Sequence, residues 1–373
     1  MKKFFLVAFL LVIKIGAFAQ TSIDVEIDGL LTLEQYQTII DNYANKDVET
    51  YSARSIYYIG FSYYMLEDDD NCLKYMDLTI EKDPTNPAAY FIKASTYNYM
   101  NRFYDAIPCF QKAISLETKK ENISKSYISL GYSHYNLNQD DLAIDAYNKA
   151  IEYDSAGGTP YIMIAQIYSK QNRDDKALEL YYKGRENASK ENENYITILF
   201  NIGLFEQKAG NYNKAETAYK ELLEIDFTDY HTYAKLIQVY NQTKEYDKIS
   251  PLKDVLYSAH KQGLIQDECL SDMFCIDQFE RKGKQIRVFE KYQEGKSETI
   301  YNKLIFYVFN NDEKMEYSIQ TEYSPAAVAF GEGKYILCAN KDDSHINYGL
   351  IFDDDSTYEE IKTSVLNILD KEE

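Results

Sequence analysis

The chain has 373 residues, which is enough for two ordinary domains that each bury a core. Its 60 acidic and 40 basic residues give a formal net charge of −20, which argues against nucleic acid and anionic membrane surfaces as partners. An aromatic content of 15 %, with 37 Tyr, 18 Phe and no Trp, excludes a disordered acidic chain.

The N-terminus has the features of an export signal. Two lysines precede an apolar run over residues 4–13, and a small-x-small site ends at Ala19. The run is too short to cross a bilayer, and Lys14 interrupts it, which disfavours a membrane anchor. We therefore expect residues 1–19 to be a signal peptide. The mature protein is expected to be soluble and periplasmic or at the cell surface, with no membrane span.

Five cysteines are too few and too scattered for a disulfide framework. Cys72 and Cys109 fall within predicted helices, so we expect them to be small core residues. Cys269 and Cys275 are close enough in sequence to pair, although their spacing does not establish a bridge.

A helical phrase with a fixed pattern recurs along the chain. It places a small residue, an aromatic residue four positions later and a small or apolar residue three positions after that, all on one helix face. Small residues let helices approach closely, and the aromatic ring fills the space beside them. The copies contain Ala106, Phe110 and Ala113; Ala143, Tyr147 and Ala150; Ala177, Tyr181 and Gly184; and Ala215, Tyr219 and Leu222.

A second helical pattern with a small central residue precedes each copy. The steps between these centres are 34, 37, 34 and 38 residues, a period that indicates a helical solenoid. Polar turns between the helices are expected to provide N-caps, and the acidic run at residues 68–70 is interpreted as such a cap rather than a metal site. The small centres are Gly60, Ala94, Gly131, Ala165 and Gly203.

On these residues the chain resembles the tetratricopeptide repeat family, with helix pairs of about 34 residues and Pro84 closing the first clear repeat. Two features depart from the family pattern: Trp is absent, and the later repeats lack the closing Pro. The resemblance covers residues 52–263, with a degenerate sixth unit beginning at Tyr233. It implies an α-helical solenoid of about five to six helix pairs. Before it, residues 20–51 form an expected N-terminal capping segment, with a helix predicted over residues 31–43.

The C-terminal region, residues 264–373, has a different pattern. Runs rich in β-branched and aromatic residues predict strands at 284–292, 303–310, 314–323, 334–340 and 344–352. Residues 310–313 predict a hairpin turn. Ser356 and Glu359 stand at capping-box spacing before a helix whose apolar face is Ile361, Val365, Leu366 and Leu369. We expect a small antiparallel-sheet domain with a C-terminal helix, an α+β unit that resembles no family we recognise.

Candidate chemistry is sparse. His134 occupies a packing position, and His231 and His260 lack metal-ligand spacing. His345 lies seven residues after Cys338, which would suit a thiol–imidazole pair, but Cys338 stands in an apolar strand and is expected in the core. Phosphate-binding loops, nucleophile elbows and metalloprotease helices are missing from the sequence. We therefore expect no catalytic residue, no metal site and no cofactor.

Three functions remain open. The repeats favour a non-enzymatic scaffold that binds a protein or peptide segment and no nucleic acid. An enzyme with its site in the C-terminal domain would be favoured by a cleft holding Cys338, His345 and a carboxylate. A carbohydrate-binding protein would be favoured by Tyr and Asn clustered on one surface. We choose the scaffold.

The resemblance implies that the first helices of successive pairs line a concave face. Related repeats that grip a C-terminal carboxylate use Lys and Asn there, whereas this chain has mostly aromatic and aliphatic residues, which suit an apolar or aromatic partner segment. The alternative is that these side chains pack against neighbouring repeats. The expected partner-binding residues are Tyr57, Phe61, Tyr64, Phe91, Ser95, Asn98, Ile128, Tyr132, Tyr135, Ile162, Gln166 and Ser169.

Overall fold

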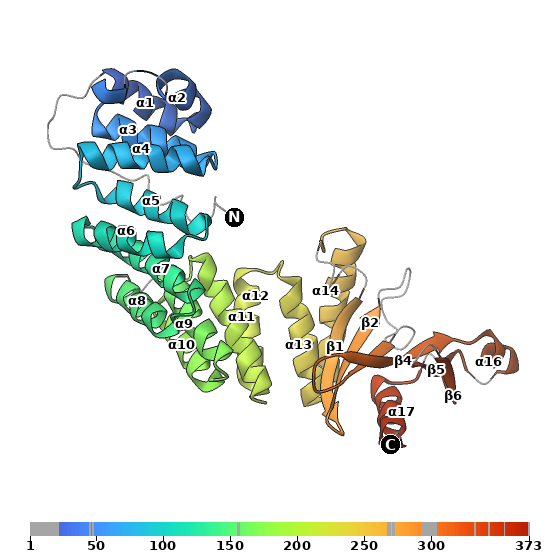
Figure 1. Ribbon diagram of the computed structural model, residues 1–373. Helices are drawn as coiled ribbons and strands as arrows, with labels where there is room; N and C mark the ends of the chain where they lie inside the picture. The colour runs from blue at the N-terminus through green and yellow to red at the C-terminus, as the bar shows by residue number, and fades with distance from the viewer. Residues whose placement is uncertain are drawn as a thin grey trace. The chain divides into compact units, whose positions relative to one another are not determined.

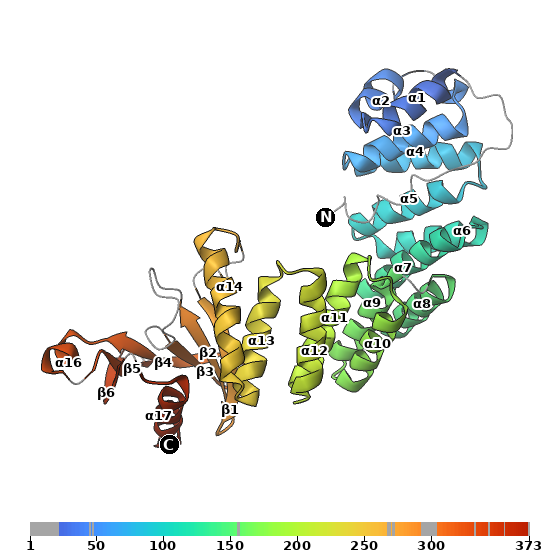
Figure 2. The same ribbon diagram turned by 180° about the vertical axis from the view of Figure 1, so that it is seen from behind.

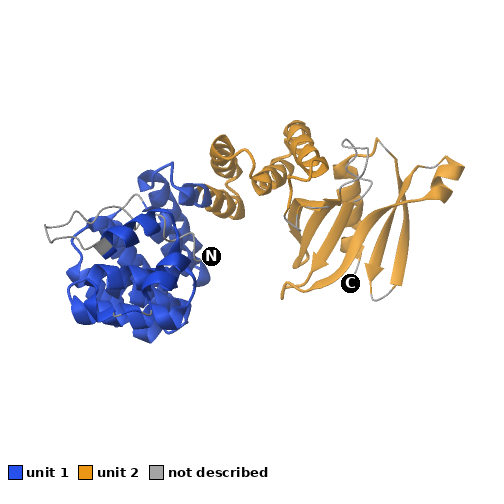
Figure 3. Cartoon of the chain, turned by 90° about the horizontal axis from the view of Figure 1, so that it is seen from above, with its two compact units in different colours: residues 1–198 blue, residues 199–373 orange. Residues whose placement is uncertain are grey.

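The protein is described by a computed structural model. It covers residues 22–44, 46, 48–154, 157–266, 270, 273–291, 304–331, 333–341, 344–353 and 355–371. The expected signal peptide and Cys269 lie outside these residues. The chain forms two compact units, Met1–Ile198 and Leu199–Glu373 (Figure 3). Among the described residues, no helix combines the length and the apolarity needed to cross a membrane.

The first unit begins with two short helices, α1 (Ser22–Thr32) and α2 (Tyr36–Tyr43), where the sequence predicted one helix over residues 31–43. Glu34 adopts a left-handed φ of 53°, and the Gln35 N–H donates to the Leu30 carbonyl, which ends α1 in a C-terminal cap. The buried carboxylate of Asp24 accepts hydrogen bonds from Ser52 and Ser55, so α1 is tied to the first repeat helix.

Four helical hairpins follow, each stacked on the next (Figure 1), as the view from behind also shows (Figure 2). A residue with a left-handed backbone lies in each turn within a hairpin, and three of these four residues are Asn, which tolerates that conformation. The pairs are α3 (Ala53–Met65) with α4 (Asp69–Lys82), α5 (Pro87–Tyr99) with α6 (Phe103–Leu116), α7 (Lys120–Asn136) with α8 (Asp140–Tyr153), and α9 (Thr159–Lys170) with α10 (Asp174–Asn187).

The predicted turn chemistry is confirmed in part. Asp68 is the N-cap of α4, where its carboxylate accepts the N–H of Asn71, as the capping interpretation expected. The N-cap residues of α8 and α10 are Gln139 and Arg173, and neither side chain makes a capping hydrogen bond. In those two helices the acidic residues instead occupy the first turn, where their charge favours the helix dipole, and Asp140 also accepts a hydrogen bond of 3.0 Å from Gln171.

Helix α11 (Glu193–Lys208) contains the division between the two units. The second unit continues with α12 (Tyr212–Ile225), α13 (Tyr230–Thr243) and α14 (Ile249–Lys261). The residues of its last helices and of its sheet form one continuous core. The change from helix to strand near residue 264 is therefore not a division between compact units. The domain bounds expected from the sequence, 20–51, 52–263 and 264–373, remain a prediction.

A six-stranded antiparallel sheet with a C-terminal helix confirms the expected α+β fold of the C-terminal region. Its strands pair in chain order, and a short helix, α16 (Pro325–Phe330), follows the fourth. The sequence did not predict α16 or the first strand. The strands are β1 (Met273–Arg281), β2 (Lys284–Lys291), β3 (Leu304–Phe309), β4 (Met315–Tyr323), β5 (Tyr335–Lys341) and β6 (Ser344–Phe352).

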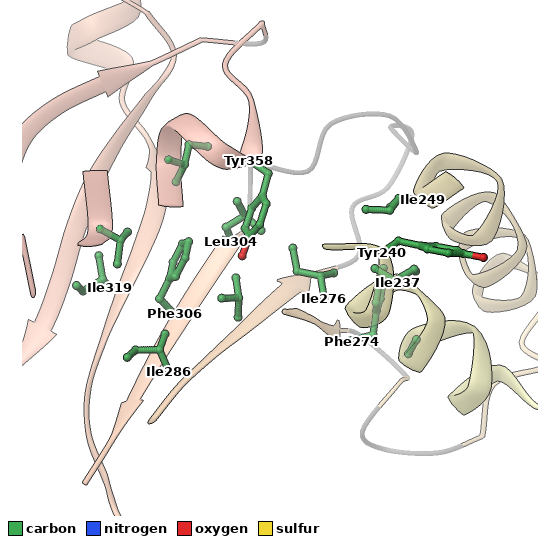
Figure 4. Close-up of a cluster of buried hydrophobic side chains, with 14 of the residues drawn as sticks. Ile237, Tyr240, Ile249, Phe274, Ile276, Ile286, Leu304, Phe306, Ile319 and Tyr358 are labelled. Atoms are coloured by element: carbon green, nitrogen blue, oxygen red, sulfur yellow. The ribbon is translucent and has the colours of Figure 1, made fainter. Parts of the chain in front are cut away.

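One face of the sheet carries the core. Val288, Phe306, Ile319 and Ala339 pair in one row across four strands and are fully buried. Figure 4 shows Phe306 beside Tyr358, the first residue of α17 (Tyr358–Lys371), and the two rings stack with centroids 6.5 Å apart. This stacking brings the C-terminal helix onto the sheet and closes the core.

The capping box and the buried face of the C-terminal helix differ slightly from the predicted ones. Its capping box consists of Thr357 and Glu360, each of which accepts the backbone N–H of the other, one residue later than the Ser356 and Glu359 that we expected. Ile368 is buried, whereas Leu366 is only half-buried. The core face is therefore rotated slightly from the predicted one.

Helix α13 covers the edge of the sheet at β1. Gln238 Nε2 donates to the Cys275 carbonyl at 3.1 Å, and Asn241 Nδ2 donates to the Ile276 carbonyl at 2.6 Å. Figure 4 places Ile237 of the same helix against Phe274 and Ile276. Side-chain amides thus satisfy backbone groups that an edge strand would otherwise leave open to another chain.

Candidate functional site

Half of the twelve residues expected on the concave face are buried. The rings of Tyr57, Phe61 and Tyr64 stack along α3 with centroids 6.2 and 6.3 Å apart. Tyr36 of α2 makes an edge contact with Phe61, and Tyr99 of α5 packs against Tyr64. Side chains used this way hold consecutive helices together. The six buried residues are Tyr57, Phe61, Tyr64, Phe91, Ser95 and Ile162.

The other six residues lie nearer the surface. Asn98, Ile128, Tyr135 and Ser169 are half-buried, whereas Tyr132 and Gln166 are exposed. Asn98 links α5 to α7, because its Oδ1 accepts a hydrogen bond of 2.8 Å from Ser133 Oγ. Tyr132, whose side chain is 44 % exposed, and Gln166 are therefore the members of the set that an incoming partner can contact directly.

Two grooves lie among the described residues of the repeats, and none of the twelve residues lines either one. The first groove has a volume of about 300 Å³ and lies between α6 and α8 over α7. The second groove has a volume of about 410 Å³ and lies between α8 and α10 over α9. The first is lined by Gln111, Ile114, Tyr127, Leu130, His134, Leu142, Asp145, Ala146 and Lys149. The second is lined by Asn148, Ile151, Tyr161, Ile164, Tyr168, Lys176, Glu179, Leu180, Lys183 and Asn187.

The two grooves correspond position by position. Tyr127 and Tyr161 occupy the same place in consecutive repeats, as do the acidic residues Asp145 and Glu179. Lys149 and the equivalent lysine, Lys183, follow these acids one helical turn later, and the lysine of the second groove is paired with its acid at 2.7 Å. The sequence does contain a signal for this correspondence, because in both helices an acidic residue is followed four residues later by a lysine.

The second groove gathers the Tyr and Asn residues that a carbohydrate site would use, but its geometry does not suit a sugar. Tyr161 is only 4 % exposed, so its ring offers no free face. The guanidinium of Arg173 lies 4.5 Å from the centroid of the Tyr168 ring, and the Lys176 ammonium lies 5.7 Å from it. Cations thus occupy positions over the ring on which a sugar would stack.

A second cluster lies on the sheet face opposite the core. Glu322 of β4, Cys338 of β5 and His345 of β6 have ligand atoms that all lie within 4.8 Å of one another. His345 Nε2 is 3.4 Å from Glu322 Oε2, and His345 Nδ1 is 3.0 Å from Asn340 Oδ1. The sequence spacing suggests a pair of Cys338 and His345, but it does not indicate that Glu322 lies beside them.

The electrostatics of this cluster do not favour a nucleophilic thiol. Burial raises the pKa of Cys338 to about 11, and the neighbouring Glu322 carboxylate raises it further in the same direction. The thiol donates to this carboxylate, whereas a thiol–imidazole pair requires the imidazole to take the proton. At neutral pH the sulfur therefore stays protonated and a poor nucleophile.

Comparison with known proteins identifies the repeats. Residues 158–226 match one model of the tetratricopeptide repeat, and residues 87–120 and 124–156 match another. These ranges extend from α5 to α12, apart from residues 121–123 and 157, and include the residues that line both grooves. None of the curated proteins matches the chain.

Solved structures resemble part of the chain. A crystal structure of MamA is 25 % identical over 45 % of this chain and 94 % of that one, with a TM-score of 0.39. MamA from Desulfovibrio magneticus RS-1 is 16 % identical over 45 % of this chain and 96 % of that one, with a TM-score of 0.41. The C-terminal part of a TPR repeat-containing protein from Cytophaga hutchinsonii is 16 % identical over 57 % of this chain and 90 % of that one, with a TM-score of 0.44.

Proposed function

The chain is a tetratricopeptide repeat protein, and on this premise we propose that it is a non-enzymatic scaffold that binds an extended segment of a partner protein along its repeats. The observation that carries the proposal is the repetition of one groove in consecutive repeats. Each groove has a tyrosine, an acid and a lysine at matching positions. An extended segment can place successive side chains in successive grooves, which gives both affinity and register.

The concave face provides a second candidate surface for the same partner. Tyr132 and Gln166 are its exposed members, and Ile128, Tyr135 and Ser169 are partly accessible beside them. Asn98 helps to position α7, which carries Tyr132, through its hydrogen bond with Ser133. A partner with an apolar or aromatic segment fits the Tyr and Ile side chains.

Quantitative affinity capture from the native host tests the proposal. The purified protein is immobilised, and the captured proteins are compared by mass spectrometry with those captured by a Lys149→Glu/Lys183→Glu variant. We expect the groove variant to weaken capture of a specific partner by about 1–3 kcal/mol, because both side chains line a groove and both charges are reversed. A Tyr132→Ala/Gln166→Ala variant tests the concave face in the same way.

A matched control separates groove binding from general charge attraction. Lys112→Glu/Lys120→Glu makes the same change in charge at exposed positions that line neither groove. Equal loss of capture in this control would contradict a groove site. Unchanged capture in both the groove variant and the concave variant would contradict binding along the repeats.

Export is part of the proposal and rests on the N-terminal sequence. The basic start, the short apolar run and the small-x-small site ending at Ala19 predict cleavage after that residue. N-terminal sequencing of the protein from its native host should begin at Gln20. An intact Met1 on the mature protein would exclude periplasmic or cell-surface export by this signal.

The absence of catalysis is also proposed. The cluster of Glu322, Cys338 and His345 is the strongest alternative, because it brings together the groups that an enzyme would need. Its buried, protonated thiol supports a role other than nucleophilic catalysis. A turnover activity that is lost in a normally folded Cys338→Ser variant would overturn this part of the proposal.

A further inference from the structure

The cluster on the outer face of the sheet has the composition of a metal site. A thiolate, an imidazole and a carboxylate together are ligands that Zn²⁺ accepts. Among the described residues, Glu322, Cys338 and His345 form the one group of three or more such side chains whose ligand atoms converge. We propose that these three residues bind a zinc ion on the sheet, independently of the binding function of the repeats.

The distances are close to those of a zinc site. Ligand atoms around a tetrahedral Zn²⁺ lie about 3.5 Å from one another, because the individual bonds are about 2.0–2.3 Å long. His345 Nε2 and Glu322 Oε2 are already 3.4 Å apart, and Cys338 Sγ lies within 4.8 Å of both side chains. The His345 side chain is 52 % exposed, so its ring can move the remaining distance without disturbing the core.

The orientation of His345 is a second, independent indication. Asn340 Oδ1 can only accept a hydrogen bond, so His345 Nδ1 donates to it across their 3.0 Å contact. In the neutral imidazole this leaves the lone pair on Nε2, the atom that faces Glu322. Histidines that bind metals are held in the same way, with the non-binding nitrogen donating to an oxygen.

The position of the three residues suggests what the ion does. Glu322, Cys338 and His345 come from three neighbouring strands, and β6 is an edge strand of the sheet. Most residues of β6 are exposed, and its pairing with β5 is interrupted by a register shift between Ile336 and Cys338. A zinc ion would join β6 through β5 to β4 and stabilise this edge. The three side chains leave a fourth position for water.

The overall charge favours the ion as well. On binding, the Cys338 thiol releases its proton to solvent, and the resulting thiolate and the Glu322 carboxylate neutralise the two charges of Zn²⁺ at the site. The chain has a net charge of −20, so its field attracts cations. The alternative is a direct contact between His345 and Glu322 that needs no metal.

Titration of the purified full-length protein with Co²⁺ and then Zn²⁺ distinguishes these possibilities. We expect one Co²⁺ per chain, with a thiolate-to-cobalt charge-transfer band and the visible spectrum of tetrahedral Co²⁺, both abolished by Zn²⁺. His345→Ala and Glu322→Gln should each weaken Zn²⁺ binding at least about tenfold, and Cys338→Ser should remove the charge-transfer band. Asn340→Ala should weaken binding by about 10–100-fold and keep the band, because this residue only positions His345.

Two control variants and a second measurement, of stability and hydrogen exchange, test whether the ion binds at this cluster. Cys109→Ser and His134→Gln remove one thiol and one imidazole outside the cluster and should leave Zn²⁺ binding unchanged. Zn²⁺ should raise the melting temperature and slow hydrogen exchange in β6 of the unaltered protein, and should do neither in His345→Ala. Since His345 is exposed, this variant is expected to fold. Lack of a charge-transfer band in the unaltered protein, or a band that persists in Cys338→Ser, would overturn the site.

Discussion

Gly131 of α7 lies directly against the ring of Tyr147 of α8, and a β-carbon at position 131 would stand only 2.6 Å from Tyr147 Cε1. Gly203 has the same relationship to Tyr219 in the second unit. The small residue of the first helix and the aromatic residue of the second are therefore two halves of one contact. The contact sets how closely the helices of a pair approach, which explains why both halves recur together in the sequence.

Gly131→Ala should destabilise the protein by about 1–3 kcal/mol, because the added methyl group must displace a fully buried ring. Thermal and denaturant unfolding measure this change. The matched control is Gly29→Ala in α1, where a β-carbon would meet no atom within 4 Å. That exchange should be stabilising by about 0.5–1 kcal/mol, since Ala favours the helix. Similar effects of the two substitutions would contradict the contact.

The repeats could be predicted because their information is local. Each pair needs only a small residue, an aromatic residue and a turn at a regular spacing, and the sequence shows all three. Strand β1 was missed because Asp277 interrupts its apolar pattern. The buried carboxylate of Asp277 accepts hydrogen bonds of 2.7 Å from the Tyr358 hydroxyl and from Lys362 Nζ, and both donors are far away in the sequence. A single sequence does not reveal such a partner.

The candidate sites depend even more on distant contacts. Glu322 and His345 meet only because β4, β5 and β6 pair with a particular register, which includes a shift after Ile336. The grooves arise from the stacking of consecutive hairpins, although their acid and lysine positions were visible in the sequence. The concave-face residues were placed by resemblance alone. The resemblance did not foresee that an aromatic stack would bury Tyr57, Phe61 and Tyr64.

Phe61→Ala should destabilise the protein by about 3–5 kcal/mol, because the ring is buried between the residues of its stack and Tyr36. Tyr132→Ala should cost less than about 1 kcal/mol, because its ring is substantially exposed. Melting temperatures of the two variants provide the test. An unchanged melting temperature for Phe61→Ala, with reduced partner capture, would instead assign Phe61 to the binding surface.

Stability should fall at high pH. Burial raises the pKa of the Tyr181 hydroxyl to about 12, whereas a tyrosine in the unfolded chain ionises near pH 10. The unfolded state therefore releases the proton first, and the stability that is present below pH 10 is lost as the pH rises towards 12. Unfolding measured from pH 8 to 12 should show this decline. Tyr181→Phe should make the decline smaller, and an identical slope in both proteins would refute the assignment.

The buried ion pair between Lys253 of α14 and Glu290 of β2 provides the final prediction. The Lys253 Nζ to Glu290 Oε1 distance is 2.9 Å, Tyr257 donates to the same oxygen at 2.6 Å, and both charged side chains are almost fully buried. Lys253→Met leaves the carboxylate without its counter-charge and should cost about 3–5 kcal/mol. The double variant Lys253→Met/Glu290→Met removes both charges and should recover most of that loss.

Burial already raises the pKa of Glu290, so the loss of stability in the single variant Lys253→Met should be smaller at pH 5 than at pH 8. Denaturant unfolding of the three proteins at both pH values measures these differences, and a double variant as unstable as the single one would show that packing, not the unpaired charge, dominates.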